Sequence, residues 1–119
     1  MLFTFGLYSR VQEAIAMIDR ARLEELREEV GNDDFAEVIE LFCEEVAETL
    51  DRMAQGHSSS MADDLHFLKG SALNIGMSEV ASLCAAVEAM IRDNGAASPN
   101  IGGIKTAFDK AQVELMRQP

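Results

Sequence analysis

The sequence predicts an all-α protein, an antiparallel up-down-up-down four-helix bundle with a short additional N-terminal helix covering one end. The composition favours helix over sheet, since 48% of the 119 residues are hydrophobic, only two are Pro and none is Trp. Apolar residues recur at helical spacing in several segments along the chain. The connections between these segments are only a few residues long, which makes neighbouring helices antiparallel.

The first two predicted helices follow each other closely. Asp19 precedes residues 20–30 as an N-cap, and Gly31 follows them as a residue in the left-handed conformation. Asn32 or Asp33 then caps a longer helix. Its apolar positions predict one buried face, made by Phe35, Val38, Ile39, Phe42, Val46, Thr49, Leu50 and Met53.

Three further helices complete the predicted bundle. Ser60 caps a third helix that runs through MADDLHFLKGSALNI to Gly76, and Ser78 caps a fourth. Pro99 suits the first turn of a fifth. The apolar stripes of the fourth and fifth helices are Val80, Leu83, Cys84, Val87 and Ile91, and Ile101, Ile104, Phe108, Ala111 and Leu115.

The predicted domain organisation is a single bundle over residues 18–117, preceded by an N-terminal extension over residues 1–17. The extension contains Leu2, Phe3 and Leu7, for which the bundle plan supplies no partner. Two interpretations stay open, in which the extension packs on the surface of its own bundle or contacts a second copy. We otherwise expect a monomer.

The formal net charge of −11 excludes several classes of function. Binding to nucleic acid requires a basic surface, and an anionic membrane repels an acidic protein, so neither is an expected partner. No apolar run approaches the ~20 residues that span a bilayer, and we expect a cytoplasmic protein. Cys43 and Cys84 lack the spacing of metal ligands and are expected to be small apolar packing residues.

The third predicted helix places a histidine on its exposed side. At 100° per residue, its core stripe comprises Met61, Leu65, Leu68, Ala72 and Ile75, and His66 lies about 140° from the centre of that stripe. The residues around His66 on the same surface are Ala62, Asp63, Lys69, Gly70 and Leu73. His66 is therefore predicted to be exposed to solvent.

The neighbours of His66 indicate chemistry. Gly70 lies in mid-helix, where glycine costs about 1 kcal/mol relative to alanine, and its missing side chain gives another protein close access to the imidazole. Lys69 supplies a positive charge that can offset the charge of a phosphoryl group. A neutral imidazole nitrogen has a lone pair available for nucleophilic attack. These features together favour transfer of a phosphoryl group.

The string His66-Phe67-Leu68-Lys69-Gly70-Ser71-Ala72-Leu73-Asn74-Ile75-Gly76 resembles the signature of histidine-containing phosphotransfer (HPt) domains. The resemblance implies that His66 Nε2 is phosphorylated in two-component signal transduction. It implies a carrier without kinase activity, whose partners are response regulator receiver domains and a hybrid sensor histidine kinase. It also implies no intrinsic cofactor, since the receiver supplies Mg²⁺.

Two residues of the fourth helix extend the expected site. Glu88 and Arg92 are four residues apart and predict an ion pair on a side that faces His66. By analogy with HPt domains of the yeast phosphorelay type, Glu88 accepts a hydrogen bond from Nδ1–H of His66, and Arg92 favours the phosphate. The opposing interpretation is an ordinary surface pair.

The expected docking surface for a partner comprises exposed small and apolar residues around His66, namely Ala62, Asp63, Gly70 and Leu73, with Leu41 on the second helix. Two alternatives remain. One is a helical interaction module that binds receivers or a kinase without carrying phosphate. The other is a di-metal carboxylate protein, because Asp63-x-x-His66 is similar to half of a paired metal motif, but no metal site is expected without the second half.

Overall fold

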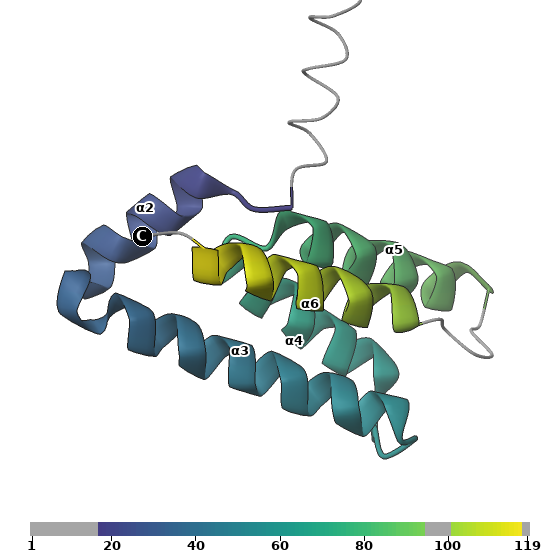
Figure 1. The fold of residues 1–119 in the computed structure, drawn as a ribbon. Helices are drawn as coiled ribbons and strands as arrows, with labels where there is room; N and C mark the ends of the chain where they lie inside the picture. The colour runs from purple at the N-terminus through teal and green to yellow at the C-terminus, as the bar shows by residue number, and fades with distance from the viewer. Residues whose placement is uncertain (1–16, 95–100, 118–119) are drawn as a thin grey trace, which may run out of the picture.

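A computed structural model describes residues 17–94 and 101–117 of the chain. In these residues it contains five α-helices and no strand, as predicted (Figure 1). The helices are α2 (Arg20–Val30), α3 (Asn32–Ala54), α4 (Met61–Asn74), α5 (Ser78–Asn94) and α6 (Gly102–Arg117). The four longer helices form the bundle, and α2 crosses its end beside the start of α3. Pro99 and most of the N-terminal extension lie outside the described residues.

Side chains cap α2 and α4 at the predicted positions. The Asp19 carboxylate accepts a hydrogen bond from the Arg22 N–H at 3.1 Å, and the Ser60 hydroxyl accepts one from the Asp63 N–H at 3.3 Å. Each cap satisfies a backbone donor that has no partner within its helix. Ser60 thereby fixes the start of α4, less than two turns before His66.

The predicted cap of α3 is wrong. Asn32 is the first residue of the helix, and its N-cap is Gly31, which has no side chain to accept a hydrogen bond. Gly31 has a φ of 87°, so the chain turns from α2 into α3 across a single residue. Ser78 is likewise the first residue of α5 instead of its cap.

A second glycine ties α2 to the turn between α4 and α5. The Asp19 N–H donates a hydrogen bond to the Gly76 carbonyl at 2.7 Å. A Cβ atom at Gly76 would lie 2.8 Å from the Asp19 carbonyl oxygen, and the φ of Gly76 is 72°. Glycine is therefore required here for both contact and conformation. The Arg22 side chain also donates to the Asn74 carbonyl, so α2 anchors the C-terminal end of α4.

The core forms between the bundle helices, and α4 packs most closely against α5. On α4 the predicted stripe is buried at Leu65, Leu68, Ala72 and Ile75. The stripe of α3 is only half confirmed. Its C-terminal half is buried at Val46, Thr49, Leu50 and Met53, whereas Phe35, Val38, Ile39 and Phe42 are only partly buried. Both cysteines are buried and free, as expected.

None of the helices in the described part of the chain is both long enough and apolar enough to span a membrane.

Candidate functional site

His66 lies on the exposed face of α4, as the helical periodicity predicts. Its side chain is 75% exposed, while Leu65 and Leu68 beside it in sequence are fully buried. The core stripe of α4 holds the helix with this face outward, so the position of His66 follows directly from the apolar pattern. Ala62, Asp63, Gly70 and Leu73 are exposed as well.

The surface beside His66 is open at Gly70. A Cβ atom built on Gly70 has no atom within 4 Å beyond the backbone of its own helix. The protein itself therefore has no steric need for glycine at this position, and its φ is not positive. An alanine would fit and would favour the helix. Glycine at this position leaves open space on the surface one turn beyond His66.

Glu88 of α5 connects His66 to Lys69. Its Oε2 lies 3.9 Å from Nδ1 of His66, beyond hydrogen-bond distance, so the expected Nδ1–H hydrogen bond is not formed in this structure. Its Oε1 lies 3.7 Å from Nζ of Lys69. The side chains of Glu88 and Lys69 are 22% and 33% exposed, so this charge pair lies at the edge of the bundle where solvent screens it only partly. The three residues form one cluster across the α4–α5 interface, which we call the histidine cluster.

The Glu88 carboxylate is incompletely hydrogen-bonded. Its Oε1 is buried and has no hydrogen-bond partner, because Lys69 Nζ is just beyond hydrogen-bond distance. A buried carboxylate oxygen without a partner is costly, so Glu88 has a strong preference for a nearby positive charge. A cationic imidazole at His66 would supply such a charge on its Oε2 side.

Beneath the histidine cluster lies the Cys84 thiol. Burial raises its pKa to about 12, with a smaller contribution from the Glu88 carboxylate and an opposing one from Lys69. The thiol is therefore neutral near pH 7 and too protonated to act as a nucleophile. Cys84 is therefore a packing residue.

The predicted ion pair between Glu88 and Arg92 is wrong. Glu88 faces α4, and Arg92 Nε instead lies 3.4 Å from a carboxylate oxygen of Asp93. The Arg92 side chain is 73% exposed. The i, i+4 spacing of Glu88 and Arg92 permits a contact. Glu88 instead lies near His66 and Lys69 of the neighbouring helix α4, and spacing within α5 cannot predict contacts with another helix.

Two further apolar residues are exposed, one on α3 and one on α4. Leu41 of α3 is 54% exposed, as expected. Phe67 is 42% exposed and borders a hollow lined on its other sides by Glu45, Glu48, Thr49, Arg52 and Asp64. Phe67 is not among the residues expected at the site. Its position about 120° from the centre of the core stripe was the available signal.

A metal site has no support among residues 17–94 and 101–117, where no group of three or more His, Cys, Asp or Glu side chains is placed to hold an ion. Asp63 and His66 both face solvent instead of the bundle interior. The ligands of a di-metal bundle protein project inward, so the orientation of α4 opposes that alternative.

Comparison with known protein families identifies a family whose matched region includes α4 and His66. The profile of the Hpt domain matches residues 37–114, more than half of the chain, and this range includes His66, Lys69, Gly70 and Glu88. No curated protein and no solved structure gave a match. The chain belongs to the Hpt domain family, whose members carry phosphoryl groups in phosphorelays and are not kinases.

Proposed function

We propose that Nε2 of His66 accepts a phosphoryl group from the phosphoaspartate of a receiver domain and passes it to the aspartate of another response regulator. The observation that carries this assignment is the 75% exposure of the imidazole on a helix face whose Gly70 leaves it accessible. Membership of the Hpt family supports the same chemistry. A hybrid sensor histidine kinase is the expected source of the phosphoryl group.

The proposed step is an in-line displacement at phosphorus. The lone pair of His66 Nε2 attacks the phosphorus atom, an N–P bond forms, and the bond from phosphorus to the aspartate oxygen breaks with its electron pair leaving on the carboxylate. Nδ1 keeps its proton, so the ring becomes cationic as the bond forms. The reverse displacement on a second aspartate returns the ring to its neutral state.

Glu88 is the proposed positioning residue for this step. With its Oε2 3.9 Å from Nδ1, it favours the tautomer that carries hydrogen on Nδ1 and leaves Nε2 free to attack. The same carboxylate stabilises the cationic ring. Lys69, held 3.7 Å from Glu88, is the proposed cation for the phosphoryl oxygens. Exposed Arg92, one turn beyond Glu88 on α5, is proposed as a second one.

The proposed docking surface surrounds His66 and comprises Ala62, Asp63, Gly70 and Leu73 of α4 with Leu41 of α3. Leu73 and Leu41 are each 54% exposed, and apolar side chains at this exposure favour contact with a partner. The receiver brings the Mg²⁺ that neutralises charge on the phosphoryl group, so the chain needs no cofactor of its own. We propose that it acts as a cytoplasmic monomer.

Incubation with a receiver domain phosphorylated on its aspartate tests this function. Wild-type protein is expected to acquire a label that is lost in acid and kept in base, as an N–P bond requires. The His66→Gln variant is expected to acquire none. His57→Gln is the matched control, because His57 is exposed but lies in the turn before α4, and its label is expected to equal that of wild type.

Two results would contradict the proposal. Equal labelling of wild type and His66→Gln would place the phosphoryl group on another residue. Binding of receivers without any label would favour the alternative function, an interaction module that does not carry phosphate.

A further inference from the structure

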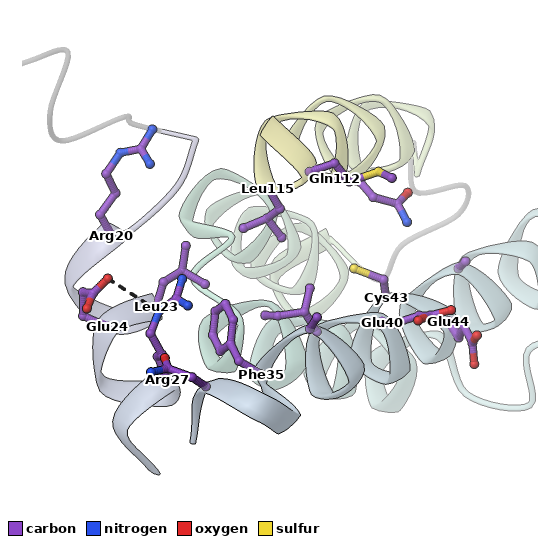
Figure 2. A pocket seen from close by; sticks show the side chains of 15 residues that line it. Arg20, Leu23, Glu24, Arg27, Phe35, Glu40, Cys43, Glu44, Gln112 and Leu115 are labelled. Carbon is purple, nitrogen blue, oxygen red and sulfur yellow. Dashed lines mark ion pairs between the residues drawn. The ribbon is translucent and has the colours of Figure 1, made fainter. Parts of the chain in front are cut away.

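A groove separate from the histidine surface opens between α2, α3 and α6. Its volume is about 940 Å³, and none of its lining residues belongs to α4 or α5. Figure 2 shows side chains from the three helices around it, with Leu23 and Phe35 on one side and Leu115 across from them. The lining is mainly apolar but has charged residues at its rim.

The groove accounts for the half-buried part of α3. Phe35 and Ile39 belong to the apolar stripe that predicts a buried face, yet both line the groove and are only partly covered. Leu115 of α6 faces the same space, and Met116 is 81% exposed beside it. Arg27 lies over the Phe35 ring, with its Cζ 4.2 Å from the ring centroid, but the stripe stays only partly covered. An apolar stripe that is incompletely covered over several turns favours an additional apolar occupant.

We propose that the occupant is the N-terminal segment of the same chain, residues 1–16. Phe3, Leu7, Val11 and Ile15 recur every fourth residue in this segment and continue the register to Ile18, which is buried in the core. That spacing places their side chains on one side of a helix, where they can pack against the apolar lining of the groove.

The point of attachment favours this segment. The described chain begins at Met17, and Arg20 lines the groove and lies 3.5 Å from Glu114 of α6. The part of α3 that lines the groove extends from Asn32 to Ala47, which is about 22 Å of helix at 1.5 Å per residue. A helix of 16 residues is about 24 Å long, so the segment matches the groove in length.

Charge favours the attached segment over a second copy of the chain. Residues 1–16 contain one cation, Arg10, and one anion, Glu13, so their net charge is zero. A second copy would bring a net charge of −11 to a groove whose lining contains three acidic residues, Glu24, Glu40 and Glu44, against two basic ones, Arg20 and Arg27. Covalent attachment also gives the segment an effective concentration in the millimolar range, which a free partner does not have.

Cys43 offers a direct probe because it lines the groove and is 5% exposed, whereas Cys84 is fully buried away from it. The test measures alkylation of both thiols by N-ethylmaleimide in the full-length chain. In the double variant Leu7→Asp, Val11→Asp, we expect Cys43 to be alkylated faster, on the order of tenfold, because the segment no longer covers the groove. The rate at Cys84 should stay unchanged.

The matched control is the double variant Ser9→Asp, Gln12→Asp. It adds the same charge to the segment at positions on the other side of the proposed helix, so its Cys43 rate should equal that of wild type. Equal rates at Cys43 in wild type and in Leu7→Asp, Val11→Asp would overturn the proposal. A rise at Cys84 equal to that at Cys43 would also overturn it, because the effect would then be general unfolding.

Sedimentation separates the segment from a second copy as the occupant. The proposal predicts a monomer at every concentration tested, in wild type and in both double variants. A concentration-dependent dimer of wild type that Leu7→Asp, Val11→Asp dissociates would overturn the intramolecular arrangement and assign the segment to a contact between copies.

Discussion

The three residues of the histidine cluster have different relations to solvent. His66 is 75% exposed, Lys69 is 33% exposed, and Glu88 between them is 22% exposed with a buried Oε1. The exposed ring is free to meet a partner, while the more buried carboxylate keeps a fixed position behind it. In the proposed function, this arrangement gives a partner access to the imidazole and lets Glu88 favour the proton on Nδ1.

The variant Glu88→Gln tests this role of Glu88. It keeps the shape of the side chain but removes the charge that stabilises a cationic ring, so we expect phosphorylation of His66 to slow. Solvent screening of the exposed ring limits the effect to roughly 1 kcal/mol or less, equivalent to about a threefold to fivefold lower rate. The measurement is the rate of label transfer from a phosphorylated receiver.

Glu79→Gln is the control for Glu88→Gln, because it removes a carboxylate from the first turn of the same helix. Its transfer rate should match that of wild type. A transfer rate and a phosphohistidine lifetime that are both unchanged in Glu88→Gln would remove Glu88 from the mechanism.

At the residue scale, the sequence predicted the exposure of His66 because a helix wheel fixes the direction of each side chain relative to the core stripe. It did not predict the partners of Glu88 and Arg92 correctly. Their contacts depend on how α5 is rotated against α4 and on competition between charges from two helices. The spacing of residues within one helix predicts neither the rotation of α5 against α4 nor this competition between charges.

Helix α4 packs into the bundle along one side and has an open surface along the other. Its buried stripe packs against the bundle, and its N-terminal cap and the anchoring of its C-terminal end to α2 hold it in register. Its exposed side contains Gly70, which weakens the helix without any benefit to packing. The helix is therefore less stable than it would be with alanine at position 70, where a partner is proposed to approach.

The variant Gly70→Ala separates helix stability from the approach of a partner. Because its Cβ meets open space, we expect the free energy of unfolding to rise by about 0.5–1 kcal/mol. Phosphoryl transfer from a receiver should nevertheless slow, on the order of tenfold, because the methyl group obstructs the approach to the imidazole. Denaturant unfolding and transfer kinetics on the same variant measure the two effects.

Gly103→Ala in α6 is the matched control, since a Cβ there also meets open space. It should leave transfer unchanged. A Gly70→Ala variant that transfers at the wild-type rate would show that Gly70 is not an access point.

At the element scale, capping residues predicted the starts of α2 and α4 because a single side chain satisfies an exposed backbone donor. The same capping preference predicts the start of α3 wrongly, because its N-cap is Gly31. Gly31 is the single residue between α2 and α3. The polar residue that follows it, Asn32, already lies within α3 and therefore does not cap it.

Across the whole molecule, the apolar patterns of the helices predicted the bundle but not how completely it closes. The stripe of α3 identifies the inward face along its full length, yet Phe35 and Ile39 in its N-terminal half line a groove. The apolar periodicity of a helix predicts which of its faces is buried. It does not predict which other element covers that face. The docking surface around His66 and the groove share helix α3, but none of the proposed docking residues lines the groove. Docking and the proposed packing of residues 1–16 therefore do not compete for the same residues.

The central claim is that one atom, Nε2 of His66, carries the phosphoryl group. The protein labelled with ¹⁵N and loaded with phosphoramidate, a small N–P donor that requires no partner, allows the bond to be located by ³¹P–¹⁵N NMR. We predict coupling between phosphorus and Nε2 of His66 and none to either nitrogen of His57. Coupling to Nδ1 of His66, or a phosphoryl group on any other residue, would contradict the account.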